Sequence, residues 1–249
     1  MKLIKQLLTV NRFSRSGRKL AKCKGIILHY VGILGQRALS TWNYFENDCP
    51  RNKHFSSAHY IVDLNGDVYQ AIPDDEIAYH CGSSEVDPVS GRVYTDWARE
   101  KFERYANNGK TSSPNHCTIG IELCINADGI FTDETLSAAA ELVVGLLKEK
   151  ELTIEDIGHH NMVVGWKNCP EPWVNNPTLF ERFIIRVRNL LYRDLALALN
   201  DCQSFGSKIP EPNIKELVIL ILKIVLSLFS QMKGFRYTYL LKFLLRKLK

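Results

Sequence analysis

The segment from residue 158 to residue 170 constrains the fold more than any other stretch, because it offers only part of a metal site. It reads GHHNMVVGWKNCP, and its glycines and proline predict an irregular loop. His159 and Cys169 are both good Zn²⁺ ligands, and Lys167 could stabilise a developing oxyanion. The spacing matches no zinc-finger pattern, so the segment alone favours a surface loop with an ordinary histidine and a buried cysteine. A metal site here therefore requires a fold that brings a third ligand and a base from elsewhere in the chain.

Two β-rich runs contain candidates for these missing groups. Residues 24–31 are typical of a buried central strand, and His29 lies near the end of that run. A single histidine there is more often a hydrogen-bonded core residue than a ligand. Glu122 is a charge inside the apolar run 118–124, where burial is costly unless the carboxylate is paired or functional. An outward-facing position on an edge strand explains Glu122 equally well.

The remaining pattern predicts a hairpin and several helices. Asn65-Gly66 separates two β-rich runs, 57–63 and 67–72, which is a strong hairpin signal. Apolar residues at helical spacing predict helices over residues 36–48, 97–105, 132–150 and from 176 onwards. Thr132 or Asp133 can cap the third of these helices. The rest of 83–117 is interpreted as a long excursion of the kind that often borders a site.

Charge is concentrated at the C-terminus. Residues 215–249 hold eight Lys/Arg and one Glu, a net charge of +7, whereas the whole chain carries +5. Affinity for polyanions should therefore belong to this basic, aromatic-rich helical tail. Contact with an anionic membrane or wall polymer explains the tail about as well as simple packing, either on the main domain or on itself in a dimer. We expect no nucleic-acid partner.

Cysteine usage and the N-terminus narrow the class of protein. Seven scattered cysteines without a CxxC pair do not form the disulfide framework of a secreted mini-domain. Lys5 interrupts the first apolar run, so we expect no signal peptide. No run is long enough for a membrane-spanning helix. The predicted organisation is an N-terminal arm, a main domain, a Gly/Pro-containing linker and the basic tail, over residues 1–23, 24–200, 201–214 and 215–249.

Between residues 24 and 175 the order of these features resembles the zinc-dependent N-acetylmuramoyl-L-alanine amidases of the type 2 amidase family. This family is related to animal peptidoglycan-recognition proteins. The matching pieces are residues 26–30, 57–62, 77–82, 118–122 and the 158–170 segment. The last three look most like endolysins and prophage amidases of Gram-positive, clostridial-type hosts. The resemblance implies an α/β fold with a mixed central β-sheet flanked by helices, followed here by the basic helical appendage.

The resemblance also implies a role for individual residues. It makes His29, His159 and Cys169 the ligands of one Zn²⁺ ion. It makes Glu122 the catalytic base and Lys167 the cation on the oxyanion side. Three protein ligands leave one tetrahedral position open, as in catalytic zinc sites.

Other positions are assigned less directly by the resemblance. His59, Tyr60 and His80 would lie behind the ligands or line the substrate pocket. Many relatives carry a catalytic tyrosine where this chain has Ala58, which rules out a tyrosine route here. This departure agrees with the subset resembling cytoplasmic recycling amidases, which use a strand glutamate where Glu122 stands. His80, His116 and Cys117 remain rival metal ligands.

The activity implied is cleavage of the amide bond between N-acetylmuramic acid and L-alanine in peptidoglycan. The favoured role is a phage or prophage endolysin, made in the cytoplasm without a signal peptide and acting at the cell wall. The alternatives are a cytosolic muropeptide-recycling amidase and a non-catalytic peptidoglycan-binding protein. A zinc nucleoside deaminase is excluded because the chain has neither a His-x-Glu nor a Pro-Cys-x-x-Cys motif. The oligomeric state stays open.

Overall fold

The computed structural model describes residues 1–107 and 112–205, and the chain divides into units Met1–Arg193 and Asp194–Lys249. The first unit is built on a six-stranded sheet with the order β1-β4-β3-β5-β2-β6. The strands are β1 Lys2–Lys5, β2 Gly25–Tyr30, β3 Tyr60–Val62, β4 Asp67–Gln70, β5 Thr118–Leu123 and β6 Ile157–His159. The β3–β4 pair is the antiparallel hairpin predicted around Asn65-Gly66, and the other neighbours are parallel. The predicted α/β architecture with a mixed sheet is confirmed.

The helices surround this sheet. They are α1 Ala38–Asn43, the π-helix η1 Tyr44–Asp48, α2 Cys49–Arg51, α3 Asp96–Phe102, α4 Arg104–Asn107, the 3₁₀ turn η3 Pro114–His116, α5 Asp133–Glu149, the 3₁₀ turn η4 Ile154–Asp156, α6 His160–Val163, α7 Glu171–Asn175 and α8 Pro177–Phe205. Thr132 caps α5 as predicted, because its side chain accepts a hydrogen bond from the Thr135 amide. Helix α8 continues to Phe205, so the first five residues of the predicted linker 201–214 are helical. The rest of that linker and the predicted tail lie outside the described residues.

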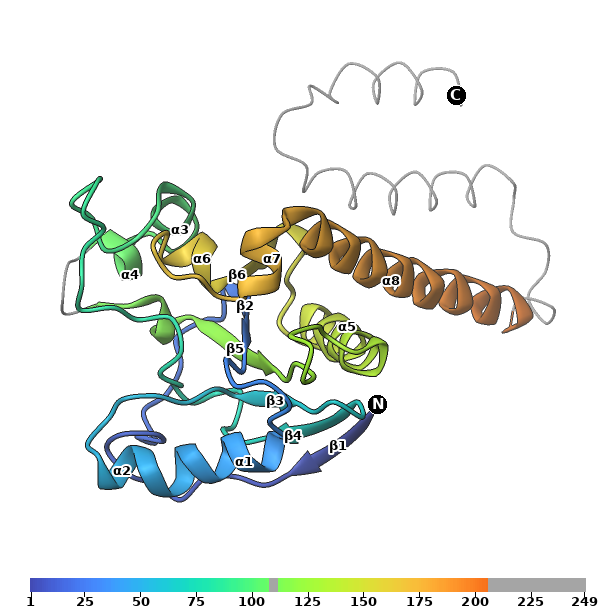
Figure 1. Cartoon of the computed structure of the whole chain (residues 1–249). Helices are drawn as coiled ribbons and strands as arrows, with labels where there is room; N and C mark the ends of the chain where they lie inside the picture. The colour runs from blue at the N-terminus through green and yellow to red at the C-terminus, as the bar shows by residue number, and fades with distance from the viewer. Residues whose placement is uncertain (108–111, 206–249) are drawn as a thin grey trace, which may run out of the picture. The chain divides into compact units, whose positions relative to one another are not determined.

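Alternation along the strands divides the side chains between two faces of the sheet. Ile26, Leu28 and Ile121 pack with α5, α7 and the first turns of α8 in one core. On the opposite face, one group of helices, α1 and α2, covers β3 and β4, while α3 and α6 pack on Ile27 of β2 (Figure 1). His29 and Glu122 fall on this second face because each lies an odd number of residues from a core-facing neighbour.

The N-terminus differs from the predicted arm. Residues Lys2–Lys5 form β1, which pairs with β4 in parallel at the edge of the sheet. Leu8 is 1% exposed and belongs to the core under α1. The two lysines of β1 are exposed because an edge strand leaves most of its side chains in solvent, although the strand itself belongs to the sheet. None of the helices in residues 1–107 and 112–205 combines the length and hydrophobicity that crossing a bilayer requires.

The Asp63 carboxylate connects the end of β3 to the start of α1. Because this connection depends on the charge of Asp63, we expect the unfolding free energy to decrease in acid. Its carboxylate accepts two hydrogen bonds from Arg37, at 2.8 and 2.9 Å, and others from the amides of Ala38 and Leu64. Burial opposes ionisation of Asp63, but these donors outweigh it and lower its pKa. A lowered pKa stabilises the fold above the unfolded-state value of about 3.9, and this stability is lost as the pH falls below it.

We therefore expect Asp63→Asn to cost about 1.5–3 kcal/mol of unfolding free energy at pH 7 and much less near pH 3. Chemical denaturation at both pH values measures the difference. An equal cost at the two pH values would contradict the charge-based explanation.

Candidate metal centre

Three parallel strands end at one edge of the sheet and deliver the candidate residues there. In the register between β2 and β5, His29 lies opposite Glu122, so both side chains emerge on the same face. Strand β6 flanks β2 on the other side, with His159 opposite Leu28. Since Leu28 points into the core with α5 and α8, His159 points there too. The next residue, His160, begins α6 and lies on the face that carries His29.

His29, His160 and Cys169 form a compact group of potential metal ligands. One ligand atom from each residue lies within 4.8 Å of the others. The His29 and His160 Nδ1 atoms are 3.2 Å apart, and the Cys169 Sγ is 3.8 Å from His29 Nδ1. His29 is buried, while His160 and Cys169 are partly exposed. The structure thus brings together two of the three predicted ligands and adds His160, which the sequence analysis did not select.

The predicted ligand His159 is not part of this group, and strand geometry explains the difference. Its ring centroid lies 4.8 Å from that of Phe180 and 6.3 Å from that of Trp173, in the core on the far face of the sheet. Burial lowers the pKa of His159 to about 4. His159 and His160 are adjacent, but one residue of extended chain turns a side chain to the opposite face. The ring also forms a hydrogen bond with the backbone of Cys169, so His159 supports the site from the core side and is not a member of the ligand group.

The group fits a zinc ion by its chemistry and its spacing. Two imidazoles and a thiol are the ligand types that zinc prefers. In a tetrahedral zinc site, two nitrogen ligands lie about 3.3 Å apart, and a nitrogen and a sulfur lie about 3.6 Å apart. The corresponding separations of 3.2 and 3.8 Å match these values closely. Burial raises the pKa of Cys169, so metal binding at neutral pH would release the thiol proton.

Glu122 and Lys167 lie next to this group. Burial raises the pKa of the Glu122 carboxyl to about 8 in the protein alone, and the Glu122 charge contributes to the raised pKa of Cys169. Burial and, to a smaller extent, the positive charge of Lys167 lower the pKa of His160 to about 4. The Lys167 Nζ lies 4.2 Å from the centre of the Trp166 ring, a cation–π contact that restrains it. A carboxyl with a raised pKa and a cation therefore lie beside the ligand group.

The residues predicted behind the ligands or in the substrate pocket are all buried. His59 uses both ring nitrogens on the backbone: its Nδ1 accepts from the Gly120 amide, and its Nε2 lies 2.9 Å from the Glu76 carbonyl. The Tyr60 hydroxyl donates to Asp74 on the core side. His80 lies behind His29, with 2.9 Å between His80 Nδ1 and His29 Nε2. His59 and Tyr60 thus support the sheet, and only His80 contacts a member of the ligand group.

Of the three rival ligands, His80 contacts His29 but is not a member of the group, and His116 and Cys117 are not members either, within the described part of the chain. Cys117 is fully buried in the core with α3 and α6, and His116 packs on the Tyr105 ring. Ala58, at the position where many relatives carry a tyrosine, is buried in the core under α1.

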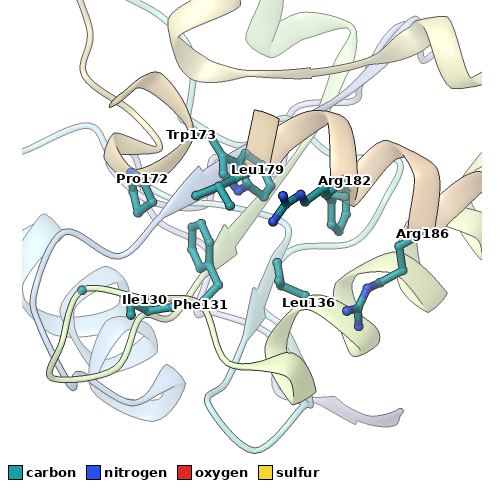
Figure 2. A pocket seen from close by; sticks show the side chains of 10 residues that line it. Ile130, Phe131, Leu136, Pro172, Trp173, Leu179, Arg182 and Arg186 are labelled. Carbon is teal, nitrogen blue, oxygen red and sulfur yellow. The ribbon is translucent and has the colours of Figure 1, made fainter. Parts of the chain in front are cut away.

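A separate hollow of about 270 Å³ lies between the 129–131 loop, α5, α7 and α8 (Figure 2). Phe131, Leu136 and Trp173 make it mostly apolar, and Arg182 and Arg186 lie along one side. Arg186 is already bonded to Asp133 and Ser137. None of His29, His160 and Cys169 lines this hollow, so it is distinct from the candidate metal centre.

Comparison with known proteins gives one family and a set of related catalytic domains. The family model described as N-acetylmuramoyl-L-alanine amidase matches residues 19–172. A probable N-acetylmuramoyl-L-alanine amidase of Bacillus licheniformis is 35% identical over 193 residues, which are 78% of this chain and 49% of that protein. BlyA of Bacillus subtilis (strain 168), also named as such an amidase, is 32% identical over 72% of this chain and 45% of its own length. The chain thus spans about half the length of these curated relatives.

Solved structures share the fold. The catalytic domain of XlyA has a TM-score of 0.55 at 22% identity, covering 75% of this chain and 99% of that domain. A mutant endolysin from Bacillus subtilis has a TM-score of 0.54 at 23% identity, covering 75% of this chain and 98% of that one. The described sheet and its helices are therefore arranged as in these proteins.

Proposed function

Because the chain belongs to the N-acetylmuramoyl-L-alanine amidase family, we propose that it hydrolyses the amide bond between N-acetylmuramic acid and L-alanine in peptidoglycan. The observation that carries this proposal is the convergence of His29, His160 and Cys169, beside Glu122, at the carboxyl edge of the sheet. A ligand group with a neighbouring carboxyl and cation has the parts that amide hydrolysis requires. An amide has a poor leaving group, so both the attacking water and the departing nitrogen need assistance.

In this proposal each residue has one task. His29, His160 and Cys169 would hold a single zinc ion, which would supply a Lewis acid and an activated water near neutral pH. Glu122 accepts the proton of the attacking water and returns a proton to the departing alanine amine. Lys167 stabilises the oxyanion that develops on the scissile carbonyl, and removing one such group typically costs about 10²–10³ in rate.

The test is a direct measurement of the bond that is cut. Purified sacculi are incubated with the zinc-loaded protein, and new alanine N-termini are labelled and counted. We expect their number to rise with time and the rise to stop when zinc is chelated. If zinc is bound but no alanine N-terminus appears, the hydrolase proposal is wrong.

The second candidate is a protein that binds peptidoglycan without cutting it. The presence of Cys169 within the ligand group argues against this alternative, because a thiol ligand is not required for binding alone. The alternative would be favoured if the parent proved inactive and a Cys169→Ser variant bound muropeptides as tightly as the parent.

For the biological role we propose a phage or prophage endolysin that is synthesised in the cytoplasm and acts at the bacterial cell wall. Cytosolic muropeptide recycling is the runner-up. The net charge of +7 in residues 215–249 supports the first role, because wall polymers and inner-leaflet lipids are anionic.

Deletion of residues 215–249 should separate these roles. We expect it to reduce lysis of whole cells while hydrolysis of a small soluble muropeptide stays near the parent rate, because the tail supplies attachment and the ligand group supplies chemistry. Turbidity loss and alanine release measure the two activities. An equal loss on both substrates would assign the tail a structural role.

A further inference from the structure

A continuous line of hydrogen bonds runs from the ligand group into the core behind it. His29 Nε2 lies 2.9 Å from His80 Nδ1, and His80 Nε2 lies 3.2 Å from the Thr118 hydroxyl. The Thr118 hydroxyl lies 2.7 Å from the carbonyl oxygen of Pro114. His29 is 2% exposed, His80 is 9% exposed and Thr118 is fully buried, so these groups depend on one another for hydrogen bonds.

The last acceptor in this line fixes the direction of every bond. The Pro114 carbonyl can only accept, so the Thr118 hydroxyl donates to it. The hydroxyl then has two lone pairs left, which accept from His80 Nε2 and from the Cys81 thiol at 3.5 Å. The Thr118 carbonyl oxygen lies 3.4 Å from His80 Nε2 and can only accept, which also requires the proton to be on that nitrogen. Hence His80 carries its proton on Nε2, and its Nδ1 is an acceptor.

The same logic extends to the ligand. His80 Nδ1 accepts, so His29 must donate from Nε2, and a neutral imidazole has only one ring proton. The bare nitrogen of His29 is then Nδ1, the atom that faces His160 and Cys169. We propose that Thr118 and His80 are positioning residues that hold His29 in the tautomer and orientation required to bind the metal through Nδ1. This inference rests on the zinc centre of the proposed function.

Two features hold the His80 ring in place. The Asn115 side chain accepts hydrogen bonds from the backbone amides of His80 and Cys81. The ring lies directly on the backbone of Gly120 in β5, where a Cβ atom would be only 2.4 Å from His80 Cγ. By contrast, the outer nitrogen of His160, Nε2, has no hydrogen-bond partner among the described residues. The hydrogen bonds from Thr118 through His80, here called the relay, therefore support His29 but not His160.

The test compares two replacements of similar size at His80. Asparagine can offer its carbonyl oxygen near the place of Nδ1, whereas leucine offers no acceptor, and both lose the ring contact with Gly120. Zinc affinity is measured on the full chain by competition with a chromophoric chelator. We expect His80→Leu to weaken zinc binding by about 10-fold to 100-fold, the usual effect of losing a partner of a metal-bound histidine. His80→Asn should recover most of that loss, and Thr118→Val should fall between the two.

A second measurement does not depend on metal or turnover. Long-range ¹H–¹⁵N NMR of the metal-free parent should show the ring proton of both His29 and His80 on Nε2. A proton on Nδ1 of His29, equal losses in His80→Leu and His80→Asn, or parent-like zinc affinity in His80→Leu would each overturn the relay. If the zinc affinities and the NMR spectra are as expected but sacculi are not cut, the proposed activity is wrong and the role of Thr118 and His80 is still supported. A parent that binds no zinc would overturn both.

Discussion

Replacing His160 by leucine should abolish zinc retention and turnover, whereas the same change at His159 should leave both largely in place. His160 Nδ1 lies 3.2 Å from His29 Nδ1, so its loss removes one of three protein ligands. We expect zinc affinity to fall by more than about 100-fold, because losing a ligand should cost more than losing a residue that is only hydrogen-bonded to a ligand. The measurements are zinc content per protein by elemental analysis and alanine release from sacculi.

The His159→Leu variant is the matched control, because it changes the neighbouring residue in the same way. The His159 ring packs on Phe180 and Trp173, and its Nδ1 is buried without a hydrogen-bond partner among the described residues. Leucine keeps the size of the side chain but loses the hydrogen bond to the Cys169 backbone, so we expect His159→Leu to lower the unfolding free energy by about 0.5–1.5 kcal/mol. Loss of zinc in His159→Leu with retention in His160→Leu would restore the ligand set implied by the family resemblance and contradict the one seen in the structure.

The difference between these two histidines shows what sequence reasoning could reach. The β-rich runs that contain His29 and Glu122 predicted strands correctly, and parallel pairing then places both residues on one face. The 158–170 segment, however, was predicted as an irregular loop. Its first residues belong to β6, and a loop offers no alternation by which to separate His159 from His160. With Ile157 recognised as a core-facing strand residue, the period of two would have assigned His159 to the core and left His160 for the site.

The residues behind the site were harder to assign for a different reason. His59, Tyr60 and His80 are polar side chains in β-rich or turn-like sequence, a pattern equally typical of a pocket and of a buried hydrogen-bond network. Their roles depend on distant partners, such as Glu76 for His59 and Thr118 for His80. Thr118 lies 38 residues from His80 along the chain, and no local spacing connects them. Such networks appear only once the strands are paired.

Replacing Glu122 by glutamine should leave the zinc centre intact and reduce turnover by about 10²–10⁴, the usual contribution of a positioned general base. Glutamine keeps the size of the side chain but cannot accept a proton from water. Glu122 lies opposite His29 in the strand register and is not one of the three ligand residues. Zinc content should therefore match the parent while alanine release falls, and thermal unfolding should show that the variant is folded.

A second carboxylate near the site makes this prediction specific. Glu171 follows Cys169 by two residues in the sequence and accepts a hydrogen bond from the Tyr30 hydroxyl at 3.2 Å. It is therefore the alternative candidate for the base. We expect Glu171→Gln to reduce turnover by less than about 10-fold, because its carboxylate is committed to Tyr30 on the exposed rim. If Glu171→Gln lost as much activity as Glu122→Gln, or if Glu122→Gln remained active with zinc bound, the proton would have to be carried by a group other than Glu122.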